Sequence, residues 1–256
     1  MKRRATAGYT IVEVIIVLAV TGGLLVSAML VLGGKQSQTQ SSESAHLFES
    51  NIEATSREVA SGFYSSDYSC TAVSAGPVSL GAGGEAGGNT GCIFLGKVIN
   101  MEPTTSTTIN IVGRQFIDGS TTDDVSTIAE AQPVKVTSGT TQFTYPYSLR
   151  VTKILDSAGA SNYQGLAYFI ELGGGISIAN NPVNGSRGIQ LYGIRGNPGD
   201  SPGSNVDLSL LVPLPEGAKI CMKTANDKPA EITVGIGGNQ YTTNTLIDNG
   251  VDNDCR

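Results

Sequence analysis

The sequence has little of what enzymes commonly use for acid–base chemistry. It contains no tryptophan and a single histidine, His46, and only 15% of its 256 residues are charged. Any serine or cysteine triad that needs a histidine has only His46, which falls in a predicted helix rather than beside a cleft. The sequence also contains neither an HExxH pattern nor a phosphate-binding P-loop. These absences predict that the protein is not an enzyme and has no catalytic residue or cofactor.

The balance of charge and small residues indicates the class of the remaining chain. The formal net charge is −6, and an acidic surface argues against direct binding of polyanions such as nucleic acid. The chain has 33 glycines and many Ser, Thr and Asn residues. This composition favours a β-rich exported domain with many turns over a helical bundle.

A long apolar run follows three cations at the N-terminus. As a helix, Ile11 to Leu32 would measure about 33 Å, close to the hydrocarbon thickness of a bilayer, about 30 Å. Because only Lys35 follows the run closely, the positive-inside rule predicts that residues 1–8 stay in the cytoplasm and the bulk of the chain is exported. A secretory signal peptide cleaved near Val26–Ala28 is the alternative, but such apolar regions are shorter and carry no acid.

Glu13 lies inside this apolar run. A carboxylate at the centre of a membrane helix costs about 2.5–3.5 kcal/mol, so an ionisable residue there is by default a functional candidate. The alternative is that Glu13 lies close enough to the interface to reach the headgroups of an ordinary signal anchor.

The residues around Glu13 form a pattern: Gly8, the aromatic Tyr9, Thr10, two aliphatic residues and Glu13, then an unbroken apolar helix. This junction resembles the N-terminal signal of type IV pilins and type II secretion pseudopilins. The resemblance implies that a prepilin peptidase cuts between Gly8 and Tyr9 and methylates the new N-terminus. It also implies that Glu13 pairs with the N-terminal ammonium of a neighbouring subunit during assembly. The sequence departs from the family at Tyr9, where phenylalanine is usual, and at Leu30, where proline is common.

The helical pattern continues beyond the apolar run. From Gln36 to Phe63 it becomes amphipathic, with an apolar stripe formed by Leu47, Phe48, Ile52, Val59 and Phe63. We expect one continuous helix from Tyr9 to about Gly62; a separate short helix after a joint at Gly33–Gly34 is the alternative. The predicted organisation is a leader (1–8), an apolar half-helix (9–34), an amphipathic half-helix (35–63) and a β-rich extracytoplasmic domain (64–256).

Beyond residue 64 the hydrophobic period becomes two, which predicts strands. The expected strands are Cys92–Ile99, Thr107–Val112, Tyr147–Leu155, Leu166–Leu172, Leu208–Leu214, Lys219–Lys223, Glu231–Ile236 and Gln240–Ile247, the last two joined as a hairpin. Long polar stretches at 74–90, 118–131 and 179–204 are expected to be loops and contact surfaces. The predicted fold class is α+β, with the long helix packed against an antiparallel β-sheet.

The four cysteines suit an oxidising compartment, where disulfides persist. Of three connectivities, we predict Cys70–Cys92 and Cys221–Cys255, because these pairs close two local loops. The second pair resembles the C-terminal disulfide loop of many pilins. No CxxC spacing supports zinc, and the Asp-rich tail from Asp248 to Asp254 favours a solvated turn over a calcium site.

Two functions are compatible with the sequence. The first is a minor structural subunit of a type IV pilus-like filament or secretion pseudopilus, whose partners are a prepilin peptidase and the helices of other subunits. This subunit is a single-pass protein of the cytoplasmic membrane before it joins a cell-surface or periplasmic filament. The second is a monomeric surface protein for binding or adhesion, with the helix as a tether only.

Overall fold

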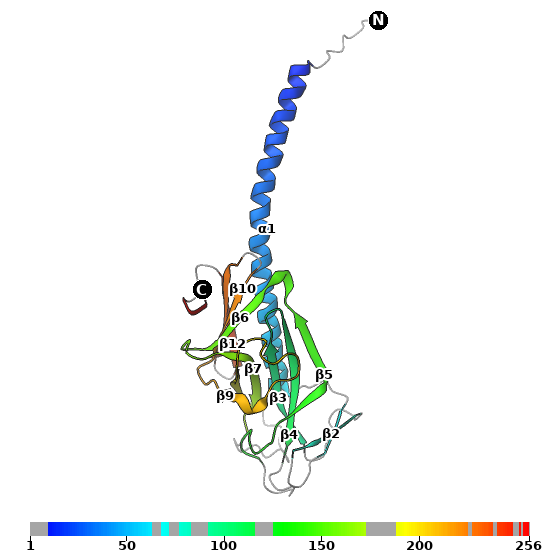
Figure 1. Cartoon of the computed structure of the whole chain (residues 1–256), viewed down its shortest axis with the longest axis vertical. Coiled ribbons are helices and arrows are strands. Elements are labelled where there is room, and N and C mark those ends of the chain that lie inside the picture. Colours follow the sequence, from blue (N-terminus) through cyan, green and yellow to red (C-terminus); the bar gives the residue numbers. More distant parts are fainter. Residues whose placement is uncertain are drawn as a thin grey trace. The chain divides into compact units, whose positions relative to one another are not determined.

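The computed structural model describes residues 10–62, 68–71, 77–82, 92–115, 125–172, 188–224, 227–237, 240–247, 251 and 253–255. It is an α+β structure with one long helix and antiparallel β-sheets (Figure 1). The chain divides into two compact units, Met1–Ser42 and Glu43–Arg256. The predicted leader and the Gly8–Tyr9 junction lie outside the described residues.

Helix α1 spans Ile11–Ser61 without a break, as expected, and includes Gly33 and Gly34. The sequence has no proline before Pro77, so no residue in this stretch lacks the backbone N–H that the helix needs. The helix ends at Gly62, which has a φ of 67° and donates its N–H to the Val59 carbonyl at 3.0 Å. Glycine adopts this left-handed conformation without steric cost, and it therefore stops the helix.

Among the described residues, the strands form three sheets in which every pairing is antiparallel. A two-stranded sheet contains β1 (Tyr68–Thr71) and β2 (Ser79–Ala82). A four-stranded sheet has the order β12 (Gln240–Ile247), β11 (Pro229–Gly237), β10 (Ala218–Lys223), β6 (Arg150–Asp156). A six-stranded sheet has the order β5 (Val134–Thr144), β4 (Thr105–Arg114), β3 (Cys92–Met101), β7 (Tyr163–Ile170), β8 (Ile189–Arg195), β9 (Leu211–Pro213).

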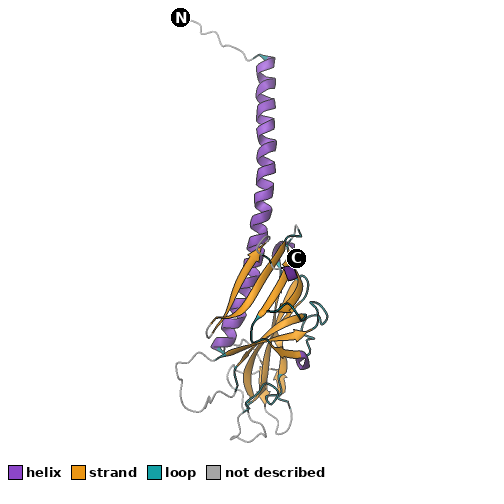
Figure 2. Ribbon diagram, turned by 90° about the vertical axis from the view of Figure 1, so that its left-hand side faces the viewer, coloured by secondary structure: helices purple, strands orange, loops and turns teal. Residues whose placement is uncertain are grey.

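The main core joins the Glu43–Ser61 part of α1 to the four- and six-stranded sheets, which lie beside it in Figure 2. Phe48, Ile52 and Val59 are fully buried here, which confirms these three members of the predicted stripe. Leu47 was wrongly included: its side chain is 45% exposed, because it points about 100° around the helix from Phe48. The buried face is completed by small residues that the hydrophobic pattern did not reveal, namely Ser44, Ala45, Thr55 and Ser56. Phe63 lies outside the described residues.

The six-stranded sheet is apolar on both faces. Ile99 of β3 and Tyr168 of β7 belong to the core with α1, whereas Val98 and Phe169 point to the opposite face. There they form a second core with apolar residues of two connecting segments, Val125, Ala131 and Val206. Every residue of β7 is consequently buried. Residues of the connecting segments therefore cover the second face of the six-stranded sheet, and the cavity described below lies there.

Four strands lie where the sequence did not predict them: β1, β2, β5 and β8. Of these, β2 falls inside the stretch 74–90, which was wrongly expected to be a loop throughout. The seven residues of β8 fall inside the stretch 179–204, which was wrongly expected to be a loop throughout. Its central Gly193 is required by packing, since a Cβ atom there would come within 2.4 Å of the Tyr163 ring. The unpredicted strand β5 is an edge strand that is mostly exposed on both faces. It therefore shows no alternation of apolar and polar residues.

The remaining predicted strands are present with shifted ends. The expected strand at 147–155 begins only at Arg150, because Pro146–Ser148 form a 3-10 turn in which Tyr147 has a φ of 52°. Similarly, Leu208–Leu210 form a 3-10 turn before β9. The predicted hairpin is confirmed by the pairing of β11 with β12 up to Gly237 and Gln240.

The disulfide Cys221–Cys255 is present, as predicted, and joins β10 to the C-terminal 3-10 turn Asn253–Cys255. Leu155, Leu246 and Val251 pack around it in a small apolar cluster. Cys92 is also disulfide-bonded, but the side chain of its predicted partner Cys70 lies outside the described residues. The second predicted pairing therefore stays a prediction.

Candidate functional site

The N-terminal unit carries the largest apolar surface in the part of the chain that the structure describes. Ile11–Met29 is long and apolar enough to cross a membrane, with a mean hydropathy of 2.4. All of its side chains are exposed within the structure, and the large apolar ones include Ile11, Val14, Leu18, Leu24 and Met29. Exposed apolar surface of this extent is costly in water, so lipid or other helices must cover it.

The two hydroxyl groups in the middle of this segment make hydrogen bonds within the helix. Thr21 Oγ1 donates to the Val17 carbonyl at 2.7 Å, and Ser27 Oγ donates to the Leu24 carbonyl at 2.9 Å. A hydroxyl that bonds to the preceding turn presents no unsatisfied donor to hydrocarbon. The segment therefore behaves as an apolar helix despite these polar residues.

Glu13 occupies the first turn of α1, and its side chain is exposed. Its backbone N–H donates to Thr10 Oγ1 at 3.3 Å. Thr10 and Glu13 thus have the spacing of a capping box, in which a threonine and a glutamate three residues later satisfy the free N–H groups of a helix start. A carboxylate is also favoured at this end by the helix dipole. This local role was not predicted, although the sequence contains the T-x-x-E spacing.

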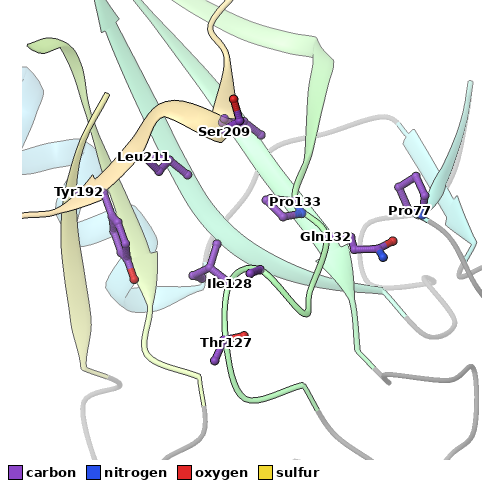
Figure 3. A pocket seen from close by; sticks show the side chains of 10 residues that line it. Pro77, Thr127, Ile128, Gln132, Pro133, Tyr192, Ser209 and Leu211 are labelled. Atoms are coloured by element: carbon purple, nitrogen blue, oxygen red, sulfur yellow. The ribbon is translucent and has the colours of Figure 1, made fainter. Parts of the chain in front are cut away.

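A cavity of about 720 Å³ lies on the second face of the six-stranded sheet (Figure 3). Its walls come from the turn before β5, from β8 and from the 3-10 turn before β9. Ten residues line it: Pro77, Thr127, Ile128, Ala129, Gln132, Pro133, Tyr192, Leu208, Ser209 and Leu211. None of the ten carries a charge. The sequence did not predict this site, because its residues come from separate segments: the expected loops, the expected strand at 208–214 and a stretch left unassigned.

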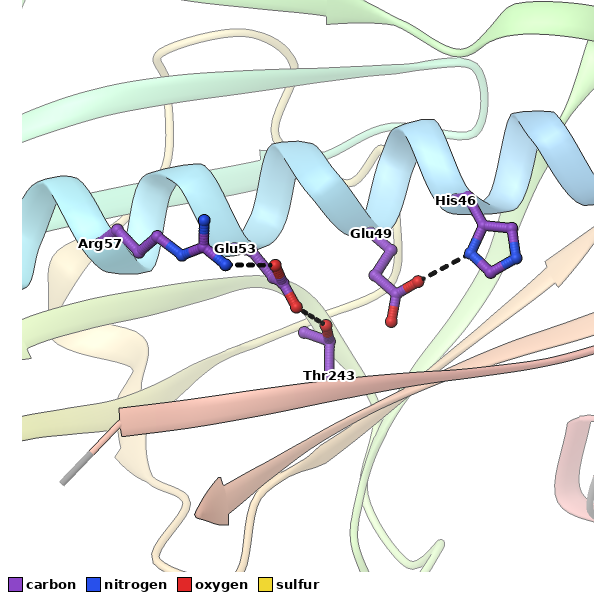
Figure 4. Close-up of polar contacts among 5 residues, drawn as sticks. All are labelled: His46, Glu49, Glu53, Arg57 and Thr243. Carbon is purple, nitrogen blue, oxygen red and sulfur yellow. Dashed lines mark hydrogen bonds and ion pairs between the residues drawn. The ribbon is translucent and has the colours of Figure 1, made fainter. Parts of the chain in front are cut away.

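The polar face of the second half of α1 makes contacts within its own unit (Figure 4). Arg57 Nη2 donates to Glu53 Oε2 at 2.9 Å, and Thr243 Oγ1 of β12 donates to Glu53 Oε1 at 2.6 Å. His46 Nδ1 lies 3.0 Å from Glu49 Oε2, and the His46 side chain is 61% exposed. His46 therefore lies on a solvated helix face and not in a cleft.

Glu49 is the carboxylate on this face whose pKa is displaced. Burial raises the pKa, but hydrogen bonding with His46 and with threonine hydroxyls of β12 outweighs this, so the pKa lies below its usual value. On the opposite side of the helix, the buried Lys97 of β3 donates to Glu58 Oε2 at 2.5 Å. These contacts fix the second half of α1 to strands of both large sheets.

One pentapeptide matches a catalytic pattern that was not predicted from the sequence. Gly199–Gly203 reads G-D-S-P-G, the spacing of the G-x-S-x-G nucleophile elbow. In an elbow the serine sits between a strand and a helix, whereas here the segment consists of turns between β8 and a 3-10 turn. The Asn100 side chain donates to the Ser201 carbonyl at 2.5 Å and to the Gly203 carbonyl at 2.8 Å, so the segment is held as structure. This arrangement lacks the context of a nucleophile elbow.

The structure joins two of the predicted site residues, Cys221 and Cys255, in a disulfide. Glu13 is in the first unit, while Cys221 and Cys255 are in the second, and Gly8 and Tyr9 lie outside the described residues. Parts of the predicted contact loops, at 74–76, 83–90, 118–124 and 179–187, also lie outside them. No protein-family model matches this chain, and no curated protein or solved structure matches it either.

Proposed function

We propose that the protein is a minor subunit of a type IV pilus-like filament or secretion pseudopilus. The observation that carries the proposal is the uncovered apolar helix Ile11–Met29, with a single carboxylate, Glu13, in its first turn. Before assembly this helix holds the subunit in the membrane. During assembly neighbouring helices replace the lipid, and Glu13 accepts the N-terminal ammonium of another subunit.

The second half of α1 supports the same proposal. An ordinary membrane tether needs only a spanning segment, yet α1 continues to Ser61 and supplies Phe48, Ile52 and Val59 to the core of the folded unit. A pilin-like fold has this combination of an apolar stem and an amphipathic half-helix on an antiparallel sheet. The acidic, β-rich unit then faces outward and serves filament initiation or contact.

The competing function is a monomeric surface protein that is only tethered by α1. The cavity lined by Tyr192 and Gln132 favours it, because a ligand site suits a binding module. The two functions differ in one respect: a tethered module works as a monomer, whereas a pilin must leave the membrane for a filament.

Processing gives the first test. Gly8→Ala should leave the uncut chain in the membrane, and the wild-type protein should begin with N-methylated Tyr9 in intact-mass analysis. The matched control is Ala7→Ser, which changes the neighbouring residue and leaves the glycine in place. A mature N-terminus at Met29 would instead establish a secretory signal peptide.

Assembly gives the second test. Quantitative mass spectrometry of sheared filaments should find the protein at substoichiometric levels, and deletion should lower the number of filaments per cell. Absence from filaments, together with an unchanged filament number, would overturn the proposal and support the tethered module.

A further inference from the structure

We infer that the cavity on the second face of the six-stranded sheet binds an uncharged ring compound that carries an N–H or O–H donor. Its volume of about 720 Å³ lies within the range of small-molecule sites, about 300–1,000 Å³. The site belongs to the folded unit alone and does not depend on the filament proposal.

The wall residues determine the kind of ligand. Ile128, Pro133, Leu208 and Leu211 give the cavity an apolar surface, and Tyr192 adds an aromatic ring. Burial of a charged ligand against uncharged walls would remove its hydration without replacing it by an ion pair. An uncharged ring, in contrast, gains both apolar burial and contact with the Tyr192 ring.

The polar requirement comes from Gln132. Its Oε1 atom is buried and accepts no hydrogen bond from the part of the chain that the structure describes. A buried acceptor without a donor carries a desolvation cost, which a ligand N–H or O–H would remove. Figure 3 shows the Gln132 amide on the side of the cavity nearest Pro77, with Tyr192 on the far side. A ligand can therefore place its ring against Tyr192 and its N–H or O–H group beside Gln132.

The walls are already held in place by their own contacts. The Tyr192 ring meets the Phe169 ring edge-on at 5.4 Å, and its hydroxyl donates to Gln190 Oε1 at 2.8 Å. The turn before β5 forms one wall of the cavity and is held by Glu130. Glu130 Oε2 accepts hydrogen bonds from the Ser126 N–H at 2.9 Å and the Thr127 N–H at 3.1 Å. These hydrogen bonds, chiefly the one from the Ser126 N–H, lower the pKa of Glu130 below its usual value.

A further pair of contacts fixes this turn to the sheet. Arg114 Nε of β4 donates to the Glu130 carbonyl at 2.7 Å, and the Arg114 N–H donates to the Ala131 carbonyl at 2.8 Å. Gly113 allows this approach, since a Cβ atom there would come within 2.5 Å of the Ala131 carbonyl oxygen. A cavity with fixed walls loses little entropy when a ligand binds.

The test uses three related probes on the full chain in detergent micelles. Benzamide supplies an uncharged ring with an N–H donor, N,N-dimethylbenzamide lacks the donor, and benzoate is charged. We expect chemical-shift changes at Ile128 and Leu211 with benzamide at a Kd of order 1 mM, about tenfold weaker binding of the dimethyl compound, and none of benzoate. Equal responses to all three probes would overturn the inference.

Three variants test where in the protein benzamide binds and which group it contacts. Ala129→Phe places a ring in the cavity and should abolish benzamide binding, whereas Thr141→Phe on the exposed edge strand β5 adds the same ring elsewhere and should not. Gln132→Met keeps the size of the side chain but removes the acceptor, so it should eliminate the preference for benzamide over its dimethyl form. Benzamide shifts that persist in Ala129→Phe, or shifts at Ile128 that follow protein dilution without any probe, would overturn the inference. The latter would indicate that a second copy covers the cavity.

Discussion

The two halves of α1 place their apolar side chains in opposite environments. Leu18 in the first half is 64% exposed, whereas Phe48 in the second half is fully buried. The first half is apolar on every side, and the second has an apolar stripe with charged residues opposite. Helix formation alone therefore does not determine whether a segment is covered by lipid or packs on a folded unit. The angular distribution of apolar residues decides whether it needs lipid or neighbouring helices all round, or a single sheet surface.

The largest effect is expected from the buried half. Phe48→Ala should lower the free energy of unfolding of the folded unit by about 3–5 kcal/mol, because it leaves a cavity where Phe48 meets the rings of Tyr145 and Phe143. Urea denaturation of the full chain in micelles measures this loss. The adjacent Leu47→Ala is the matched control and should change the value by less than about 1 kcal/mol. Equal losses from both variants would mean that the stripe does not define the core.

Substitutions in the exposed half should change membrane insertion but not the free energy of unfolding of the folded unit. Leu18→Asp should disfavour insertion by about 2.5–3.5 kcal/mol, because it puts a carboxylate near the middle of the apolar segment. The membrane-bound fraction should fall while the urea midpoint of the folded unit stays unchanged. Leu18→Ala, which removes bulk without adding charge, is the control. An unchanged membrane fraction in the aspartate variant would contradict a spanning role for this segment.

A smaller effect should distinguish the capping role of the first turn from the proposed role of Glu13 in assembly. Thr10→Ala removes the acceptor for the Glu13 N–H and should weaken the helix start by about 1 kcal/mol, a rise of about fivefold in amide exchange at residues 11–14. Glu13→Gln should leave exchange unchanged, because glutamine also suits the third helical position. Under the proposed function it should nevertheless lower incorporation into filaments. Normal incorporation of Glu13→Gln would leave Glu13 with its local role only.

The smallest effect concerns pH and is confined to the second half of α1. Because the pKa of Glu49 is lowered on folding, its stabilising contribution is present above its unfolded pKa of about 4.3 and is lost as the pH falls through the lower folded pKa. Glu49→Gln should therefore cost less than about 1 kcal/mol at pH 7 and progressively less at acidic pH. Urea titrations between pH 2 and 7 measure the difference, with the exposed Glu43→Gln as control. A constant difference over this range would contradict the assignment.

Some features could be predicted from the sequence because they depend on neighbouring residues. The apolar run and the amphipathic pattern that continues it predicted one long helix, and the short separation of Cys221 and Cys255 predicted their disulfide. Other features depend on residues that are distant in the chain. In the sequence Gly193 resembles a loop glycine, and its packing role depends on the Tyr163 ring, which lies against it in the fold. Gln132 lines a cavity only because the fold brings Tyr192 and Leu208 to the same site.

The hydrogen bonds of Thr21 and Ser27 within their own helix have a consequence for the choice of neighbours. With both hydroxyls already engaged, the middle of the segment offers no polar group by which another helix could recognise it. Closely apposed helices would have to discriminate by shape alone, so many sliding arrangements would have nearly equal energy. Under the proposed function, Glu13 at one end of the segment is then the group that selects a single register between neighbouring helices.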